Sequence, residues 1–150
     1  MKNLFLIIIL FVGSIIYSQN LTNIESADTL YVYFKYNKGK QHHNKEKWPI
    51  KNQNYDTYYF IFSDDPYQYM TFLHYPLSSP GEKTEKKSFL KKKKNVIINY
   101  QFLTQFTLPD ASKIFESKKK VYLIDYKDFC SGKIKLKEVK VMGAIPQNEE

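Results

Sequence analysis

The feature that most constrains the fold of this chain is an alternation of apolar and other side chains with a period of two. In residues 29–37, Leu30, Val32, Phe34 and Tyr36 fall on one side and the residues between them on the other. This period is typical of a β-strand, because successive side chains of a strand point to opposite faces of the sheet. Similar runs occupy residues 55–63, 67–75, 83–90, 95–103, 121–126 and 133–142. The sequence therefore predicts about seven short strands.

Turn signals separate these runs, and helix signals are nearly absent. Asp64, Asp65 and Pro66 lie between two aromatic runs, which predicts a hairpin. One short helical turn is expected over residues 110–117, with Asp110 as its cap. Many short strands with so little helix indicate an all-β domain. We expect an antiparallel β-sandwich, with a small β-barrel as the alternative.

Three further local predictions follow from the pattern. In the last run the apolar phase shifts between Leu136 and Val139, which indicates a β-bulge or a change of the buried face. Segment 38–54 is long and polar, and we interpret it as a loop. Segment 143–150 is short and polar and is expected to be a frayed tail.

The N-terminus has the composition of a cleavable secretory signal. Lys2 precedes an apolar run of thirteen residues from Leu4 to Ile16, and small Ser18 suits the position before the cut. A membrane-spanning helix needs about 20 apolar residues, so an uncleaved anchor is the weaker interpretation. We expect a signal peptide at 1–18, a single β-rich domain at 19–150, and a periplasmic or extracellular location.

Positive charge is the main compositional signal. The chain has 23 Lys and no Arg against 15 acidic residues, which gives a formal net charge of +8. The lack of Arg disfavours sequence-specific reading of nucleic acid, which depends on the planar guanidinium fork. The densest cluster is Lys91 to Lys94 with Lys83, Lys86 and Lys87, and a second run is Lys118 to Lys120. Such clusters attract anionic polymers, or they keep strand edges soluble and unpaired.

Aromatic side chains on the outward faces of strands form a second candidate surface. Rings on a flat sheet face can stack on sugar rings while their hydroxyl groups form hydrogen bonds. The alternative is that these rings pack across neighbouring strands. The candidate ligand-binding residues are Tyr31, Tyr33, Trp48, Tyr58, Tyr59, Tyr67 and Tyr69, together with Lys91, Lys92, Lys93 and Lys94.

The histidines do not predict a metal site. His42 and His43 are adjacent, so their side chains point in different directions, and no carboxylate or Cys recurs at a ligand spacing. We interpret them as solvated histidines. His74 lies within an alternating aromatic run, so it is expected to be a half-buried sheet residue with a hydrogen-bond partner rather than a general base.

Candidate nucleophiles and acids are equally weak. The single Cys130 cannot form an internal disulfide, and no signature of a cysteine hydrolase surrounds it. Asp64 with Asp65, or Asp125 with Asp128, can supply paired carboxylates for glycoside hydrolysis, but both pairs also fall where turns are expected. No motif in the sequence implies a cofactor.

These observations favour an exported, non-catalytic β-sandwich module. Its expected partner is an anionic or carbohydrate polymer or another envelope protein, bound by Tyr and Lys side chains. One alternative is a small extracytoplasmic hydrolase that uses the paired carboxylates. Another is a structural or accessory subunit that docks through an exposed strand edge.

Overall fold

The computed structural model describes residues 21–37, 40–50, 53–65, 68–75 and 81–143. The strands are β1 (Thr29–Phe34), β2 (Gln41–Ile50), β3 (Gln53–Asp65), β4 (Gln68–His74), β5 (Glu82–Lys86), β6 (Ile97–Ile98), β7 (Lys120–Asp125) and β8 (Lys133–Met142). The helices are α2 (Leu21–Ser26), α3 (Phe89–Lys92), α4 (Tyr100–Leu103) and α5 (Leu108–Glu116), with 3-10 turns η1 (Lys94–Val96) and η2 (Tyr126–Asp128). No helix within these ranges has the length and apolar character needed to span a bilayer. The predicted signal peptide at 1–18 and most of the predicted tail lie outside the described residues.

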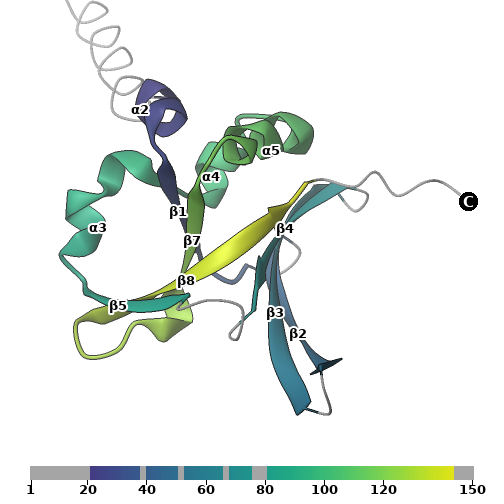
Figure 1. Cartoon of the computed structure of the whole chain (residues 1–150). Coiled ribbons are helices and arrows are strands. Elements are labelled where there is room, and N and C mark those ends of the chain that lie inside the picture. Colours follow the sequence, from purple (N-terminus) through teal and green to yellow (C-terminus); the bar gives the residue numbers. More distant parts are fainter. Residues whose placement is uncertain (1–20, 38–39, 51–52, 66–67, 76–80, 144–150) are drawn as a thin grey trace, which may run out of the picture.

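The strands form one mixed sheet with two wings joined by β8 (Figure 1). One wing holds β5, β7, β1 and β6, and the other holds β4, β3 and β2. Along β8, residues 133–137 pair with β5, residues 137–139 with β7 and residues 140–142 with β4. Lys137 is the junction of this arrangement, because it pairs with Glu82 on one edge of β8 and with Leu123 on the other.

The two halves of β8 bury opposite faces. Ile134 and Leu136 pack in one core cluster, whereas Val139 packs in the other. Residues an even number apart share a face of a strand, so the buried face changes between residues 136 and 139. The registers with β5, β7 and β4 are each continuous. The predicted change of buried face is therefore confirmed, and it occurs without a bulge in these pairings.

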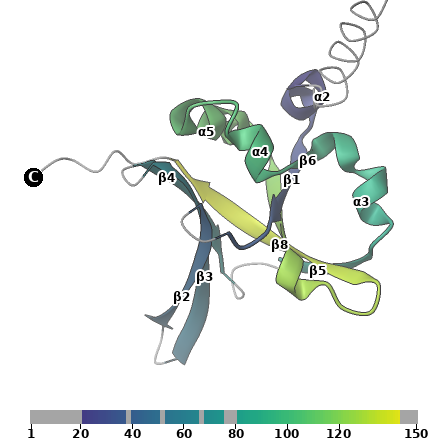
Figure 2. The same ribbon diagram turned by 180° about the vertical axis from the view of Figure 1, so that it is seen from behind.

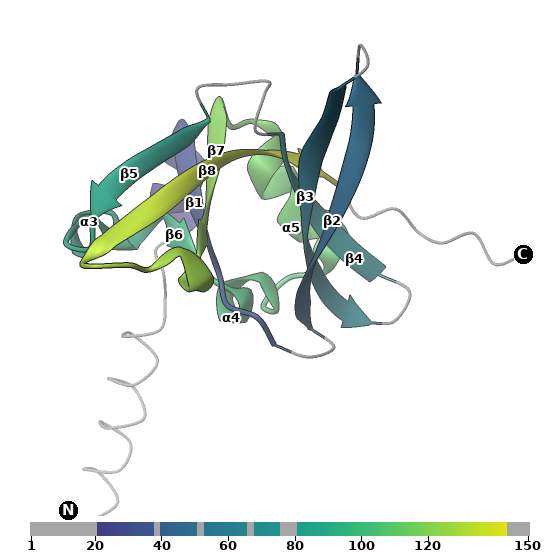
Figure 3. The same cartoon turned by 90° about the horizontal axis from the view of Figure 1, so that it is seen from below.

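The larger core lies between the two wings, with α4 and α5 beside it (Figure 3). The ring centroid of Phe62 lies 5.5 Å from that of Phe34 and 5.3 Å from that of Phe72, both in edge-to-face geometry. Phe102 of α4 and Phe115 of α5 are buried in the same cluster. Edge-to-face rings are more favourable than face-to-face ones because the positive edge of one ring meets the negative face of the next. Aromatic packing therefore fixes how the two wings approach each other.

A smaller core lies on the other side of the β1–β7 pair, next to α3 (Figure 2). Tyr31 stacks on Tyr122 with 5.8 Å between ring centroids, and it meets Phe89 of α3 edge-to-face at 5.0 Å. Burial raises the pKa of Tyr31, and the neighbouring Tyr122 acts in the same direction. The Tyr31 hydroxyl therefore stays protonated at neutral pH. This core holds α3 against the end of the sheet that carries β5.

Several predictions agree with this structure. The all-β class is confirmed, and the predicted hairpin is formed by β3 and β4. The predicted strand at 133–142 has the bounds of β8. The predicted helical turn at 110–117 is α5, which begins earlier because Thr107 rather than Asp110 caps it. The Oγ1 atom of Thr107 accepts a hydrogen bond from the backbone nitrogen of Asp110 at 3.3 Å.

The direction of one strand differs from the antiparallel arrangement that was predicted. β1 runs parallel to both β6 and β7, whereas the other pairs between strands are antiparallel. Parallel neighbours need a long connection; the chain from β2 to η1 lies between β1 and β6, and α4 and α5 are added to it before β7. Among the described strands the order runs from β2 at one end to β6 at the other, so the sheet is open and does not form the alternative closed barrel.

Segment 38–54, predicted to be a loop, is largely the strand β2. On the side that pairs with Phe60 and Phe62, its residues are His43 and Gln41, which are polar. The hydrophobic alternation that marks a strand is therefore missing from this segment. Its strand conformation comes from the long backbone pairing with β3 rather than from its own side chains.

Segment 95–103, predicted to be a strand, contains only the short β6 and then turns into α4. The side chain of Asn99 accepts a hydrogen bond from the backbone nitrogen of Phe102 at 2.8 Å. This bond satisfies a free amide at the start of α4, which is the usual role of an N-terminal cap. Capping by Asn99 thus outweighs the strand preference of the aromatic and apolar residues after it.

Substitution of Phe62 with Ala tests the role of the aromatic core. Phe62 is fully buried and contacts rings from β1 and β4. We expect Phe62→Ala to lower the free energy of unfolding by about 3–5 kcal/mol in urea denaturation. Tyr36→Ala is the matched control, because the Tyr36 side chain is 52% exposed and its loss should matter little. A small effect of Phe62→Ala would contradict this account of the core.

Candidate anion-binding groove

Three chain segments meet at the C-terminal end of β5: β5 itself, the turn that leads into β8, and the segment that leads into α3. Lys86, the last residue of β5, lies directly opposite Lys133, the first residue of β8. The turn before β8 has positive φ angles at Ser131 (47°) and Gly132 (74°), and a glycine accommodates the second without strain. The backbone nitrogen of Lys87 donates to the carbonyl oxygen of Gly132 at 2.8 Å. The turn is thereby tied to the start of the segment that leads into α3.

A groove of about 530 Å³ lies between β5, α3 and the first residue of β8. Phe89 lines it, and the ring of this residue also contacts Tyr31 in the smaller core. Lys92 projects from the last turn of α3 on the other side of the groove. The lining residues are Thr84, Glu85, Lys86, Ser88, Phe89, Lys92 and Lys133.

Three lysines line this groove: Lys86, Lys92 and Lys133. Within the described ranges, none of them forms an ion pair with a carboxylate, although Glu85 also lines the groove. Lys86 and Lys133 are direct cross-strand neighbours, and like charges in that position destabilise a sheet. The groove therefore holds three ammonium groups that form no ion pair among the described residues, beside the single carboxylate of Glu85.

The lysine run predicted to be a binding element extends this surface. Lys91, Lys92, Lys93 and Lys94 are all exposed, and they occupy the end of α3 and the start of η1. Only Lys92 lines the groove. The ammonium of nearby Lys87 lies 5.9 Å from the ring centroid of Phe129, a cation–π distance. The run thus flanks the groove instead of forming it.

The second lysine run has a structural role. The Nζ atom of Lys118 donates to the carbonyl oxygen of Glu25 at 2.6 Å. The Nζ atom of Lys119 lies 2.8 Å from Asp28 Oδ2, and that of Lys120 lies 3.7 Å from Glu138 Oε2. These contacts join the segment after α5 to α2, β1 and β8. Their charges are therefore largely compensated, in contrast to those of the groove.

The candidate tyrosines do not gather on one exposed face. Tyr31 is only 9% exposed, so its ring serves packing rather than an open stacking surface. Tyr33 is half-buried and meets Phe129 with 6.1 Å between centroids. Tyr58, Tyr59 and Tyr69 are half-buried in the other wing. Tyr67 and the side chain of Trp48 lie outside what the structure describes.

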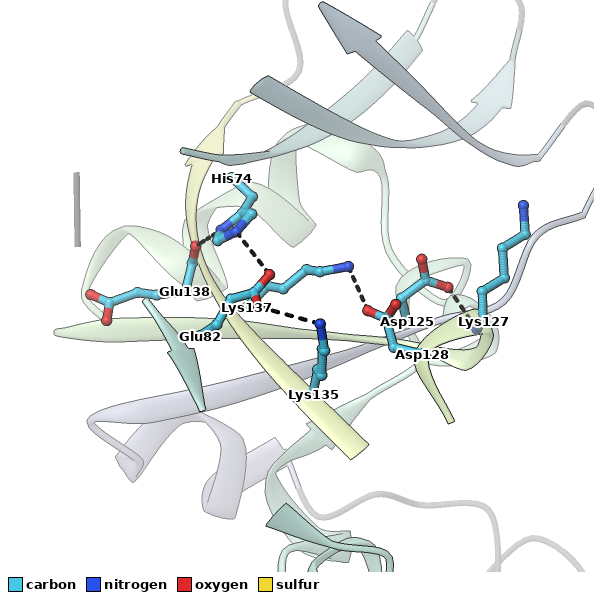
Figure 4. Close-up of polar contacts among 8 residues, drawn as sticks. All are labelled: His74, Glu82, Asp125, Lys127, Asp128, Lys135, Lys137 and Glu138. Atoms are coloured by element: carbon cyan, nitrogen blue, oxygen red, sulfur yellow. Dashed lines mark hydrogen bonds and ion pairs between the residues drawn. The ribbon is translucent and has the colours of Figure 1, made fainter. Parts of the chain in front are cut away.

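A polar cluster surrounds the junction at Lys137 (Figure 4). The ammonium of Lys137 forms an ion pair with Asp128 of η2 and lies 5.4 Å from the ring centroid of Phe60. His74 at the end of β4 is 1% exposed, so it is fully buried rather than half-buried as predicted. Its Nδ1 atom lies 2.8 Å from the carbonyl oxygen of Glu138, which is the partner that the sequence led us to expect. The cluster therefore ties η2, β4 and β8 together.

The remaining His, Cys and Asp candidates do not come together in one site. His42 and His43, predicted to be solvated loop histidines, are instead half-buried residues of β2, because this segment pairs with β3. His43 stacks on Phe60 with 6.0 Å between centroids. Cys130 is exposed and lies in the turn before β8. The side chain of Asp125 accepts from the backbone nitrogen of Lys127 at 3.0 Å and caps η2. The side chains of Asp64 and Asp65 are not described, and no set of three metal-ligating side chains occurs among the residues that are.

Lys133 and Phe89 line the groove, but the sequence did not indicate either of them as a ligand-binding residue. Lys133 was assigned to a strand, and its position opposite Lys86 depends on a register that no local pattern specifies. Phe89 was placed in the predicted strand at 83–90 rather than in α3. One feature of the sequence does point to Lys133. Lysine occurs at every second position from Lys133 to Lys137, which places these positive charges on one face of β8.

Comparison with known proteins identifies no family, since no family model, no curated protein and no solved structure matches the chain. Function must therefore be inferred from the geometry of the chain itself.

Substitution of Asp128 tests the ion pair at the junction. Asp128→Asn leaves the charge of Lys137, whose side chain is 11% exposed, without its carboxylate partner. We expect a loss of about 2 kcal/mol in the free energy of unfolding, below the value for a fully buried pair because water reaches Asp128. Asp56→Asn, which breaks the exposed pair with Lys45, should cost much less. Equal losses in urea denaturation would show that the junction does not depend on this pair.

Proposed function

We propose that this protein is an exported, non-catalytic module that binds an anionic polymer, such as a sulfated or uronic glycan, in the groove between β5 and α3. The export part of the proposal rests on the N-terminal sequence. The binding part rests on one observation in particular. Lys86 and Lys133 face each other across neighbouring strands without a carboxylate partner among the described residues, and Lys92 lies across the same groove.

An anionic ligand would remove the electrostatic cost of this arrangement. A sulfate or carboxylate group between Lys86 and Lys133 would replace repulsion between two ammonium groups by attraction to both. The ring of Phe89 offers an apolar face on which a sugar ring can stack. The flanking lysines of α3 and η1 would attract further charges along the same polymer. Recognition would be by charge spacing, because Lys provides compact point charges rather than a planar fork.

The hydrolase alternative gains no support from the carboxylates that the structure describes. Asp125 caps η2 through its side chain, and Asp128 is engaged by Lys137. Neither acid is free to serve as a general acid or nucleophile while it holds these partners.

A binding panel tests the proposal. Heparin, a polyuronate and a neutral glycan are titrated against the wild type at low and high salt. The triple variant Lys86→Gln, Lys92→Gln, Lys133→Gln is compared with Lys113→Gln, Lys119→Gln, Lys120→Gln, which loses the same charge from lysines already paired with carboxylates. We expect the groove variant to bind one or both polyanions about tenfold more weakly, and the control to change little.

Two outcomes would contradict the proposal. An equal loss of affinity in both triple variants would mean that only net charge matters and that the groove is not a site. Lack of binding to every polyanion by the wild type would remove the proposed ligand class altogether. Part of the groove affinity should survive high salt if Phe89 contributes stacking, whereas purely electrostatic binding falls steeply.

A single charge reversal should separate stability from binding. Lys133→Glu places an opposite charge against Lys86, so we expect the free energy of unfolding to rise by about 0.5 kcal/mol at low salt. The same variant should lose binding to the polyanion. Lys135→Glu, which instead faces the carboxylate of Glu82, is expected to destabilise the protein. A Lys133→Glu variant that is no more stable than the wild type would show that the opposed lysines carry no electrostatic cost.

A further inference from the structure

His74 holds a buried nitrogen without a hydrogen-bond partner. Its Nδ1 atom lies 2.8 Å from the carbonyl oxygen of Glu138, and a carbonyl oxygen can only accept, so Nδ1 carries a hydrogen and donates. In the neutral ring the other nitrogen, Nε2, is then a bare acceptor. Nε2 is buried and has no hydrogen-bond partner within the described structure. An unpaired buried acceptor is unfavourable.

The group that faces this nitrogen is the carboxylate of Glu82, the first residue of β5. Glu82 Oε1 lies 3.7 Å from His74 Nε2 (Figure 4). With a neutral imidazole, two acceptors face each other and no hydrogen bond forms. A proton on Nε2 converts the same contact into a charge-assisted pair between a donor and a carboxylate. It also lets both ring nitrogens donate at once.

Other charges near His74 have partners of their own. From β8, Lys135 Nζ lies 3.6 Å from the second oxygen of Glu82, and the ammonium of Lys137 is paired with Asp128. The carboxylate of Glu138 lies 3.7 Å from Lys120 rather than beside the imidazole. From β3, the ring of Tyr58 lies 6.2 Å from that of His74. Among the described residues, Glu82 is therefore the negative group that faces the bare nitrogen.

The contact joins β5 to strands of the other wing. In the described part of the sheet β5 pairs only with β8, and its side chains are mostly exposed. Glu82 lies at one end of β5 and Lys86 of the groove at the other. Whatever holds Glu82 therefore also limits the motion of the strand that carries one wall of the groove.

We propose that His74 and Glu82 form a proton-operated latch on β5. When His74 gains a proton, the pair fixes β5 to the end of β4; when the proton is lost, β5 becomes easier to detach from β8. A second part of the inference rests on the proposed function. A latched β5 also binds the anionic polymer more tightly, because the spacing of Lys86 and Lys133 is fixed.

Amide hydrogen exchange tests the latch without any ligand. Exchange in peptides that cover β5 is measured for the purified wild type and for Glu82→Gln at about pH 8 and about pH 5.5. Comparing the two proteins at the same pH cancels the chemical pH dependence of exchange. At the lower pH we expect β5 to be about fivefold more protected in the wild type than in Glu82→Gln, with little difference at the higher pH.

Two more variants identify the groups responsible. His74→Asn keeps a donor near Glu138 but removes Nε2, so it should behave as Glu82→Gln does. Lys135→Gln is the matched control, because it removes the other partner of Glu82 and leaves the imidazole contact intact. It should retain the extra protection at low pH. If His74→Asn does not fold, the exposed position 82 still provides the test.

The outcomes separate the latch from the binding function. Equal protection of β5 in the wild type and Glu82→Gln at both pH values would overturn the latch, and so would greater protection at the higher pH. Heparin affinity is then measured at the same two pH values. Loss of the pH-dependent part of the affinity in Glu82→Gln supports the coupling. A wild type that shows the exchange effect but binds no polyanion would retain the latch and reject the proposed function.

Discussion

The strand β8 buries one face in its first half and the opposite face in its second half. Both wings of the sheet depend on this change of buried face. Ile134 and Leu136 close the smaller core, and Val139 contributes to the larger one. At the crossing point Lys137 pairs on one edge with β5 and on the other with β7. A charged residue is tolerated at this junction because Asp128 neutralises it and because aromatic rings lie beside its ammonium group.

The lysines of the protein fall into two groups, which differ in whether a negative group lies beside them. Those near α2, α5 and the second half of β8 contact carboxylates or a backbone carbonyl, and they tie separate segments together. Lys133 at the start of β8 and the lysines around α3 have no carboxylate partner in the described structure. Because the second group surrounds a groove that Phe89 also lines, lysines without an ion-pair partner and a concave surface coincide at one place. That coincidence distinguishes this surface from a generally basic exterior.

Sequence reasoning succeeded where local pattern determines structure. The alternation in 133–142 predicted both the bounds of β8 and its change of buried face. It failed in segment 38–54, where the paired strand has polar residues on both faces, and at residues 95–103, where a side-chain cap at Asn99 overrides strand preference. For the site, the run Lys91 to Lys94 could be found from composition. The opposition of Lys86 and Lys133 could not, because strand register depends on contacts between distant segments.

The most direct test of the central claim is a nuclear magnetic resonance titration of the protein with a sulfated oligosaccharide, monitored by backbone amide shifts. We expect the largest changes on residues 84–93 and 132–134, which surround the groove, with smaller changes in β5 toward Glu82. The lysines after α5 should change little. Shifts centred on residues 113–120, or spread evenly over all lysines, would contradict the assignment of the groove as the binding site.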